Sequence, residues 1–272
     1  MEILVQSSSD AATELAARIM AKEIRANARP KLGLATGRTM EAVYARLVQM
    51  HQHEGLDFSA CRTFNLDEYV GLPGDHKNSY RYYMNEHLFR RVNIELRNTH
   101  LPDGTATNLD EECQNYERLI EATGGIDLQL LGIGQSGHIG FNEPLSPFRS
   151  RTRVVRLAAS TIRQNSPLFG AADQMPHRAI TMGVETILNS RRCLLLATGE
   201  AKAEIIAQAI EGPMTSMVSA SALQLHPHCT VVLDEAAARR LTKADCFRTS
   251  CWTDFHDESF RTSSSAAIGS AR

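Results

Sequence analysis

Three short segments of the 272-residue sequence carry side chains that can bind an anion or move a proton. One of them, Gly134-Gln135-Ser136-Gly137-His138, is rich in glycine, holds an imidazole and is followed by Glu143. The glycines permit a tight turn, and a histidine exchanges protons near neutral pH. Because Glu143 can orient the imidazole or share its proton, the segment predicts an acid–base site. The alternative is a structural histidine whose ring is satisfied by a carbonyl group of the turn.

The second segment is Thr36-Gly37-Arg38-Thr39, which lies between an apolar run and an amphipathic one. Glycine lets a ligand approach the backbone, and the free N–H groups at a helix start attract anions, so a phosphate fits this loop. The alternative is an ordinary strand-to-helix turn in which Thr39 caps the helix. Lys202, near the start of another predicted helix, offers a second cationic contact to phosphate or is solvated.

The third segment is Asp67-Glu68, which follows the apolar run CRTFNL. A carboxylate exposed at a strand end can act as a proton-transfer base, whereas adjacent acidic residues are also common as solvated loop charges. The basic run from Arg149 to Arg156 likewise coats a surface or faces a second anion. There is no Gly-x-Ser-x-Gly elbow, so the sequence does not indicate Ser136 as a hydrolase nucleophile.

The elements that must position these residues are short apolar runs alternating with amphipathic stretches. We predict strands at 31–35, 61–66, 126–133, 193–198 and 229–233, and helices at 10–26, 39–51, 109–123 and 201–211. The alternation predicts an α/β fold with a doubly wound, mostly parallel, Rossmann-like sheet and helices on both faces. Ligands bind beyond the carboxyl ends of the strands in such sheets, where the three segments should therefore meet.

The composition, with 43% hydrophobic and 22% charged residues, is that of a globular protein. A net charge of -2 gives no general attraction to nucleic acid or anionic membranes, so we expect a small-molecule partner. The six cysteines lack CxxC spacing, which argues against a zinc site or a disulfide framework. The first residues do not resemble a secretory signal peptide, and no apolar stretch reaches the roughly 20 residues that span a bilayer. We therefore expect a cytoplasmic protein. We also expect one domain over residues 1–245 and a partly flexible tail over 246–272.

Several blocks of this sequence resemble the glucosamine-6-phosphate deaminase family. They are LGLATG, TFNLDEYVGL, the following Ser79-Tyr80, LLGIGQSGHIGFNEP, SRTR and SALQLHP, and they occur in the family's order. The resemblance implies a doubly wound α/β fold with no metal and no organic cofactor. It also implies amino sugar catabolism, in which glucosamine 6-phosphate and water become fructose 6-phosphate and ammonia. The steps are ring opening, proton transfer from aldose to ketose, and loss of the amine.

The resemblance also assigns roles by position. Asp67 would be the base that moves a proton between carbons 2 and 1, and His138 would drive ring opening with support from Ser136 and Glu143. The substrate-binding residues would be Thr36, Gly37, Arg38, Thr39, Glu68, Gly137, Arg163 and Lys202.

This chain departs from the family pattern at four places. Ser136 stands where the family usually has Asp or Asn, which predicts a slower enzyme because a hydroxyl is a weaker partner for the histidine. Arg38 adds a cation to a loop that commonly reads Thr-Gly-Gly-Thr-Pro. The family's phosphate arginine aligns with Ile162, and Arg163 one place later is rotated by about 100° on a helix. Val155 replaces the lysine of members that N-acetylglucosamine 6-phosphate regulates, so we expect no such activation.

Three alternatives stay open at this point. The chain could act on galactosamine 6-phosphate or another phosphosugar. It could be a sugar-phosphate sensor with weakened catalysis, given Ser136 and Arg38. A lactonase of the same broader fold is less favoured because the TFNLDEYVGL block with Asp67 resembles the deaminases. A homo-oligomer is compatible with the sequence.

Overall fold

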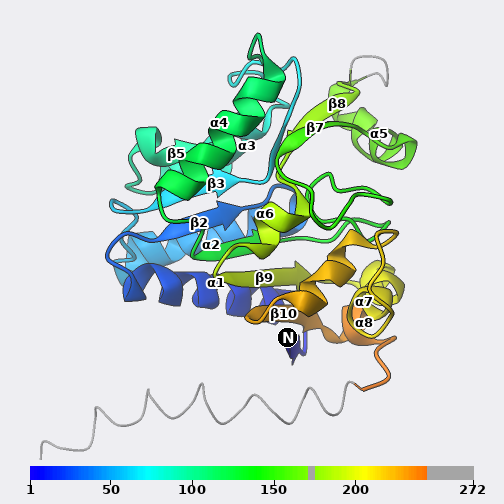
Figure 1. Cartoon of the computed structure of the whole chain (residues 1–272). Coiled ribbons are helices and arrows are strands. Elements are labelled where there is room, and N and C mark those ends of the chain that lie inside the picture. The colour runs from blue at the N-terminus through cyan, green and yellow to red at the C-terminus, as the bar shows by residue number, and fades with distance from the viewer. Residues whose placement is uncertain (171–174, 244–272) are drawn as a thin grey trace, which may run out of the picture.

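The computed structural model describes residues 1–170 and 175–243 (Figure 1). The tail predicted over 246–272 lies outside these residues, and so do Cys246 and Cys251. The other four cysteines, Cys61, Cys113, Cys193 and Cys229, are buried free thiols.

A seven-stranded parallel sheet forms the centre of the molecule (Figure 1). Its strands in spatial order are β1 (Glu2–Gln6), β10 (Cys229–Asp234), β9 (Arg192–Ala197), β6 (Leu128–Leu131), β2 (Lys31–Leu34), β3 (Arg62–Asn65) and β5 (Thr99–His100). The five predicted strands are the five inner ones, because only strands buried on both faces read as continuous apolar runs. The edge strands β1 and β5 were missed, since β1 is partly exposed and β5 has only two residues.

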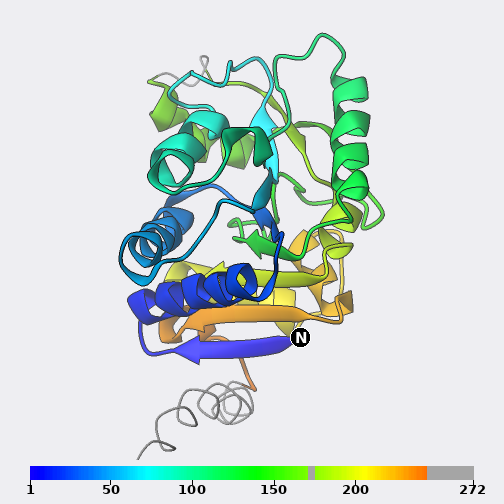
Figure 2. The same cartoon turned by 90° about the vertical axis from the view of Figure 1, so that its left-hand side faces the viewer.

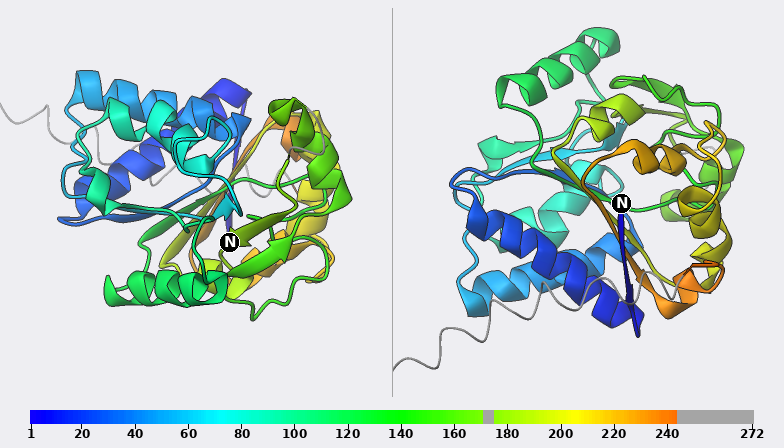
Figure 3. Two further views of the ribbon diagram at one scale, coloured as in Figure 1. Left: turned by 90° about the horizontal axis from the view of Figure 1, so that it is seen from above. Right: turned by 60° about the horizontal axis from the view of Figure 1, so that its bottom comes forward.

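Helices cover both faces of this sheet, as predicted. The α-helices are α1 (Ser9–Ala26), α2 (Arg38–Glu54), α3 (Tyr80–His87), α4 (Leu109–Ala122), α5 (Ala159–Asn165), α6 (Val184–Leu188), α7 (Ala203–Ile210) and α8 (Glu235–Ala238). Short 3₁₀ helices include η1 (Phe89–Arg91), η2 (Leu96–Asn98), η3 (Ser166–Phe169), η5 (Glu200–Lys202) and η6 (Ser219–Leu225). Figures 2 and 3 show α1 and α2 on one face and α4 and α6 on the other. The predicted fold class is therefore confirmed.

Two predicted helix starts need correction. α2 begins at Arg38 with Gly37 at its N-cap position, so Thr39 does not cap the helix. Gly37 has φ of 117°, a conformation that favours glycine. The helix predicted from residue 201 is divided into η5 and α7, and Lys202 is the last residue of η5.

A second sheet was not predicted at all. It is antiparallel and contains, in order, β4 (Asp67–Tyr69), β8 (Arg178–Thr181) and β7 (Arg153–Arg156). Three or four residues are too short for a periodic signal, and this sheet is stabilised by its own small core, which includes Tyr69, Phe141, Leu157 and Phe169. The idea that Asp67 and Glu68 form an exposed strand end or a solvated loop is wrong, because β4 holds them at 6% and 3% exposure.

The junction between the two sheets generates a stability prediction. The Tyr116 hydroxyl of α4 donates to the carbonyl of Asn65 at 2.8 Å and lies 3.2 Å from that of His100. Tyr116→Phe leaves these carbonyls without this donor, so we expect the free energy of unfolding in urea to fall by about 1–2 kcal/mol. Tyr82→Phe is the control, because no described residue hydrogen-bonds to the Tyr82 hydroxyl. Equal losses in the two variants would contradict the prediction.

Candidate active site

Four neighbouring strands of the large sheet end at the same edge. In spatial order they are β9, β6, β2 and β3. The segments that follow them carry Lys202, His138, Thr36 and Asp67, respectively. Because the carboxyl ends of parallel strands meet at one edge of a sheet, the topology gathers residues that are far apart in the sequence.

The loop after β6 forms a closed turn around His138. The N–H of Gly134 donates to the carbonyl of His138 at 2.9 Å, and the N–H of Gly137 donates to that of Gly134 at 3.1 Å. A Cβ atom on Gly134 would lie 2.2 Å from the His138 ring. Gly137 has φ of 79°, and its Cβ would lie 2.6 Å from Val218. Both positions therefore require glycine, which explains the glycine-rich sequence.

The Nδ1 atom of His138 has two partners. It lies 2.8 Å from Oγ of Ser136 and 3.1 Å from Oε2 of Glu143. The Ser136 hydroxyl donates to the same Glu143 oxygen at 3.2 Å, so its own oxygen is free to accept the Nδ1 proton. This arrangement leaves Nε2 unprotonated in the neutral imidazole, and no described residue hydrogen-bonds to it. Nε2 is therefore the ring nitrogen available to a ligand.

Glu143 is held as a carboxylate. Its second oxygen, Oε1, accepts a hydrogen bond from the Thr161 hydroxyl of α5. Partial burial opposes ionisation, but the hydrogen bonds from His138, Thr161 and Ser136 outweigh it and lower the pKa of Glu143 below its ordinary value. The carboxylate can therefore stabilise a proton on His138.

Asp67 has the opposite environment. Burial, with a further contribution from the neighbouring charge of Glu68, raises the pKa of Asp67 to about 8. A Cβ atom on Gly140 would lie only 3.5 Å from Oδ2 of Asp67, so the carboxylate lies beside the loop that carries His138. No described residue hydrogen-bonds to it. Asp67 is thus a desolvated and unusually basic carboxylate.

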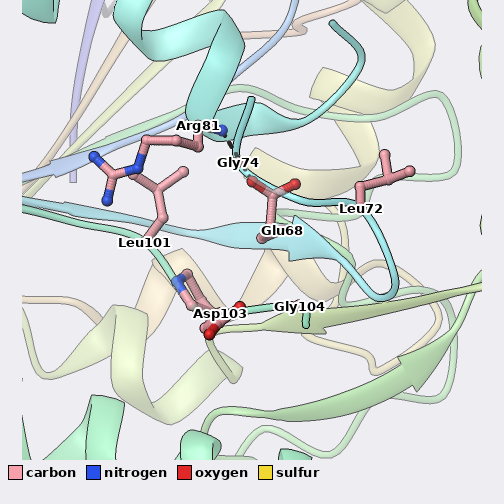
Figure 4. A pocket seen from close by; sticks show the side chains of 8 residues that line it. Glu68, Leu72, Gly74, Arg81, Leu101, Asp103 and Gly104 are labelled. Atoms are coloured by element: carbon pink, nitrogen blue, oxygen red, sulfur yellow. Dashed lines mark hydrogen bonds between the residues drawn. The ribbon is translucent and has the colours of Figure 1, made fainter. Parts of the chain in front are cut away.

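Glu68 is engaged in a structural contact. Its carboxylate accepts the backbone N–H groups of Tyr69, Tyr80 and Arg81 at 2.8, 2.9 and 2.9 Å. Figure 4 shows the Glu68 side chain pointing to the start of α3. Glu68 also lines a cavity of about 170 Å³. The Arg81 guanidinium in this cavity already donates to Thr99. Glu68 therefore accepts the first two N–H groups of α3, whose N-cap residue is Ser79, and sequence reasoning missed this role.

The loop after β2 is held by a tyrosine of α3. The Tyr83 hydroxyl donates to the carbonyl of Gly37 at 2.9 Å. The first N–H groups of α2 have no partner within the helix, which suits an anion. Arg38 is exposed and forms no ion pair with any described residue.

Lys202 lies against the His138 loop, whereas Arg163 does not. The Lys202 ammonium donates to the carbonyl of Ile133 at 2.7 Å, and burial lowers its pKa. Two of its three N–H groups are left for a ligand. Arg163 is exposed on α5, and no hydrogen bond or ion pair of its side chain to a described residue joins it to the other site residues. Its neighbour Ile162 packs into the small core.

Sequence reasoning missed Thr161, the partner of Glu143. The two residues are 18 positions apart, and no local pattern marks the contact. Tyr80 was visible only within the resemblance, through the Ser79-Tyr80 pair.

Comparisons with known proteins agree with this geometry. Residues 5–232 match the family model described as glucosamine-6-phosphate isomerases/6-phosphogluconolactonase. The chain belongs to this family. A glucosamine-6-phosphate deaminase of Shewanella woodyi is 46% identical over 91% of this chain and 94% of its own length. A glucosamine-6-phosphate deaminase of Bacillus velezensis is 48% identical over 88% of this chain and 99% of its own length.

Solved structures of the family have the same fold. A monomeric glucosamine-6-phosphate deaminase superimposes with a TM-score of 0.86 at 43% identity, over 88% of this chain and all of that one. A 6-phosphogluconolactonase from Trypanosoma cruzi gives a TM-score of 0.72 at 22% identity, over 89% and 97%, which indicates a shared fold only. Within the described ranges, no helix has both the length and the apolar character needed to span a bilayer.

The raised pKa of Asp67 predicts a pH-dependent effect on the free energy of unfolding. Its folded-state pKa of about 8 lies above the ordinary value of 3.8, so ionisation costs folding free energy as pH rises between these values. Asp67→Asn removes that cost. We expect its gain in unfolding free energy over wild type to grow by about 2–4 kcal/mol from pH 5 to pH 8 and then to level off. Urea denaturation at pH 5, 8 and 9 measures it, with the exposed Asp75→Asn as control. A gain that does not change with pH would refute the desolvation of Asp67.

Proposed function

We propose that this chain is a glucosamine-6-phosphate deaminase, which converts glucosamine 6-phosphate and water into fructose 6-phosphate and ammonia. One observation carries the proposal. The desolvated carboxylate of Asp67 lies beside the loop that carries His138, and no described residue hydrogen-bonds to Nε2 of that histidine. Isomerisation and deamination of an amino sugar need both groups, one for each proton transfer. The two relatives described above bear the same activity in their names.

Ring opening is the first step. We assign to Nε2 of His138 the removal of the proton from the hydroxyl on carbon 1 and its delivery to the ring oxygen. The bond between carbon 1 and that oxygen breaks, and an aldehyde forms. Glu143, ionised and in contact with Nδ1 both directly and through Ser136, stabilises the imidazolium between the two transfers.

Proton transfer between carbons is the second step. Asp67 removes the proton from carbon 2, and the electron pair moves onto the aldehyde oxygen, which takes a proton from the substrate's own ammonium group to give an enolamine. The same carboxyl group returns the first proton to carbon 1, which leaves a hydroxyl on carbon 1 and a protonated imine at carbon 2. Water adds to this imine, and ammonia leaves as the ketone of fructose 6-phosphate forms. Burial raises the pKa of Asp67 to about 8, which makes it a stronger base for this step than an ordinary carboxylate.

The substrate phosphate, in this proposal, lies at the Thr36–Thr39 loop with Lys202 as its cation. The loop contributes backbone N–H groups at the start of α2. The Lys202 ammonium donates to the carbonyl of Ile133, where the His138 loop begins after β6. Gly37 has no atom within 4 Å of its Cβ position, so a ligand has room there.

Ser136 motivated the alternative of a sensor without turnover. Its hydroxyl bridges His138 and Glu143, and Glu143 also reaches Nδ1 directly at 3.1 Å. Because the carboxylate performs the electrostatic role, the contacts favour an active enzyme. Location in the cytoplasm, independence of cofactors and formation of a homo-oligomer stay predictions, and the solved relative described above is named as monomeric.

Ammonia release tests the proposed function directly. We expect wild type to release ammonia from glucosamine 6-phosphate and to prefer it over galactosamine 6-phosphate in a coupled assay. Asp67→Asn should lower kcat by about 10²–10⁴-fold, because it removes a general base. The exposed Asp75→Asn is the matched control. The deaminase proposal fails if no amino sugar phosphate releases ammonia, and the mechanism fails if Asp67→Asn keeps the wild-type rate.

The pH profile tests the role of Asp67. A base must be ionised to act, so kcat/KM should rise with pH and level off above about 8, the pKa of Asp67. The substrate amine is titrated separately and its contribution removed. A profile that is flat from pH 6 to pH 9 after this correction would exclude Asp67 as the base.

A further inference from the structure

The arginines of the basic run differ in their partners. Arg149 and Arg151 form ion pairs with Glu185 of α6 and Glu117 of α4, respectively. Arg153 is half-buried and forms no ion pair with any residue in the described ranges, and burial lowers its pKa. The mechanism above gives this cation no role. Its guanidinium acts through hydrogen bonds to uncharged groups.

The Arg153 guanidinium joins two residues that lie on either side of Glu143. Its Nη1 atom donates to Oδ1 of Asn142 at 2.9 Å, and its Nη2 atom donates to Oγ of Ser146 at 3.1 Å. Asn142 is fully buried and is also held in another way, because its amide nitrogen donates to two backbone carbonyl groups at 2.9 and 2.8 Å. Arg153 therefore links Ser146 to a residue that is already fixed.

The segment between these two contacts contains a strained turn. The N–H of Ser146 donates to the carbonyl of Glu143 at 3.0 Å, which closes a four-residue turn with Pro144 second and Leu145 third. Leu145 has φ of 74°, and no other non-glycine residue in the described ranges has a positive φ. This pattern is typical of a type II turn, whose third position favours glycine or asparagine. Strain of this kind persists only where surrounding contacts hold the backbone.

The contacts that hold this turn come from outside it. Leu145 is 73% exposed, so burial of its side chain does not offset the strain. Its N–H donates to the carbonyl of Ser216 at 2.8 Å, and Arg153 holds the next residue, Ser146. Without the guanidinium, Leu145 can return to a negative φ, which opens the turn and displaces Glu143. A displacement of about 1 Å is enough to impair catalysis by a positioned group.

We propose that Arg153 is a positioning residue, which holds the strained turn 143–146 so that the Glu143 carboxylate meets Nδ1 of His138. The proposal rests on the proposed function for the roles of Glu143 and His138. Arg153 acts through Glu143, since its side chain hydrogen-bonds to the residues that flank this carboxylate. A guanidinium does not lose its proton in proteins, so the turn is held at every pH at which the imidazole titrates.

Relief of the strain tests the proposal. Arg153→Gln should lower kcat for ammonia release about 10–100-fold, the loss expected when a catalytic group is slightly displaced. KM should stay within about 2-fold, because substrate binding is not touched. Glycine adopts a positive φ without strain, so adding Leu145→Gly to Arg153→Gln should restore kcat to within about 3-fold of wild type. Leu145→Ala removes the same exposed side chain but keeps the strain, and it should restore nothing in that background.

Arg151→Gln is the matched control for loss of a guanidinium, because Arg151 lies in the same run and pairs with Glu117 instead. It should keep kcat within about 2-fold of wild type, as expected for a partly exposed ion pair. If Arg153→Gln does not fold, Ser146→Ala takes its place. This variant removes only one of the two contacts, and it should show a smaller loss with the same rescue by Leu145→Gly.

Two kinetic outcomes overturn the proposal. One is a wild-type kcat in Arg153→Gln. The other is a loss that Leu145→Gly does not restore, or that Leu145→Ala restores equally well, because the strain at Leu145 would then have no part in the effect.

Failure of the proposed function is distinguishable from failure of the positioning role. Hydrogen bonds to the Glu143 carboxylate lower its pKa, and titration of this group by carbon NMR, assigned with Glu143→Gln, needs no substrate. In Arg153→Gln the pKa of Glu143 should rise towards its ordinary value. Leu145→Gly, but not Leu145→Ala, should lower it again, which an effect of the lost charge alone does not explain. An unchanged pKa of Glu143 in Arg153→Gln overturns the positioning role even if wild type releases no ammonia.

Discussion

The site depends on one residue that joins the two sheets, Leu66, which lies between β3 and β4. Its N–H donates to the carbonyl of Leu34 in β2 at 3.0 Å, and its own carbonyl accepts the N–H of Met182 at 2.7 Å. The chain therefore leaves the parallel sheet and enters the antiparallel one without an intervening loop. Asp67 is the next residue and the first of β4, so the strand holds its carboxylate buried from water beside the His138 loop. A loop at this position would have left it in water with an ordinary pKa.

The two principal carboxyl groups differ because their surroundings differ. Asp67 receives no hydrogen bond from a described residue, and burial raises its pKa. Glu143 receives hydrogen bonds from Ser136, His138 and Thr161, which outweigh its partial burial. One group is thus suited to take a proton from carbon, and the other to stay charged next to an imidazolium. Such a division of carboxyl environments is a general way to assign acid–base roles.

Local sequence patterns predicted the inner strands and the glycine turn because these features are set by neighbours in the chain. The glycines at 134 and 137 are required by a backbone turn and by close packing, which a glycine-rich sequence indicates. The small sheet was not predictable, because its strands are short and because β4 pairs with residues of β8 about 110 positions away, such as Asp67 with Thr181. The contact of Thr161 with Glu143 and the contact of Glu68 with the start of α3 were not predicted for the same reason, since both are contacts between elements.

The strand order of the large sheet also has a consequence for synthesis on the ribosome. β1 is the first strand of the described chain, and its one neighbour in the sheet is β10, the last. It therefore emerges early and stays without its partner while β2, β3 and β6, which bring the loops of the site, pair with one another. Strand β1 can therefore join the sheet only after β10 has been made, whereas β2, β3 and β6 can pair as soon as β6 is available.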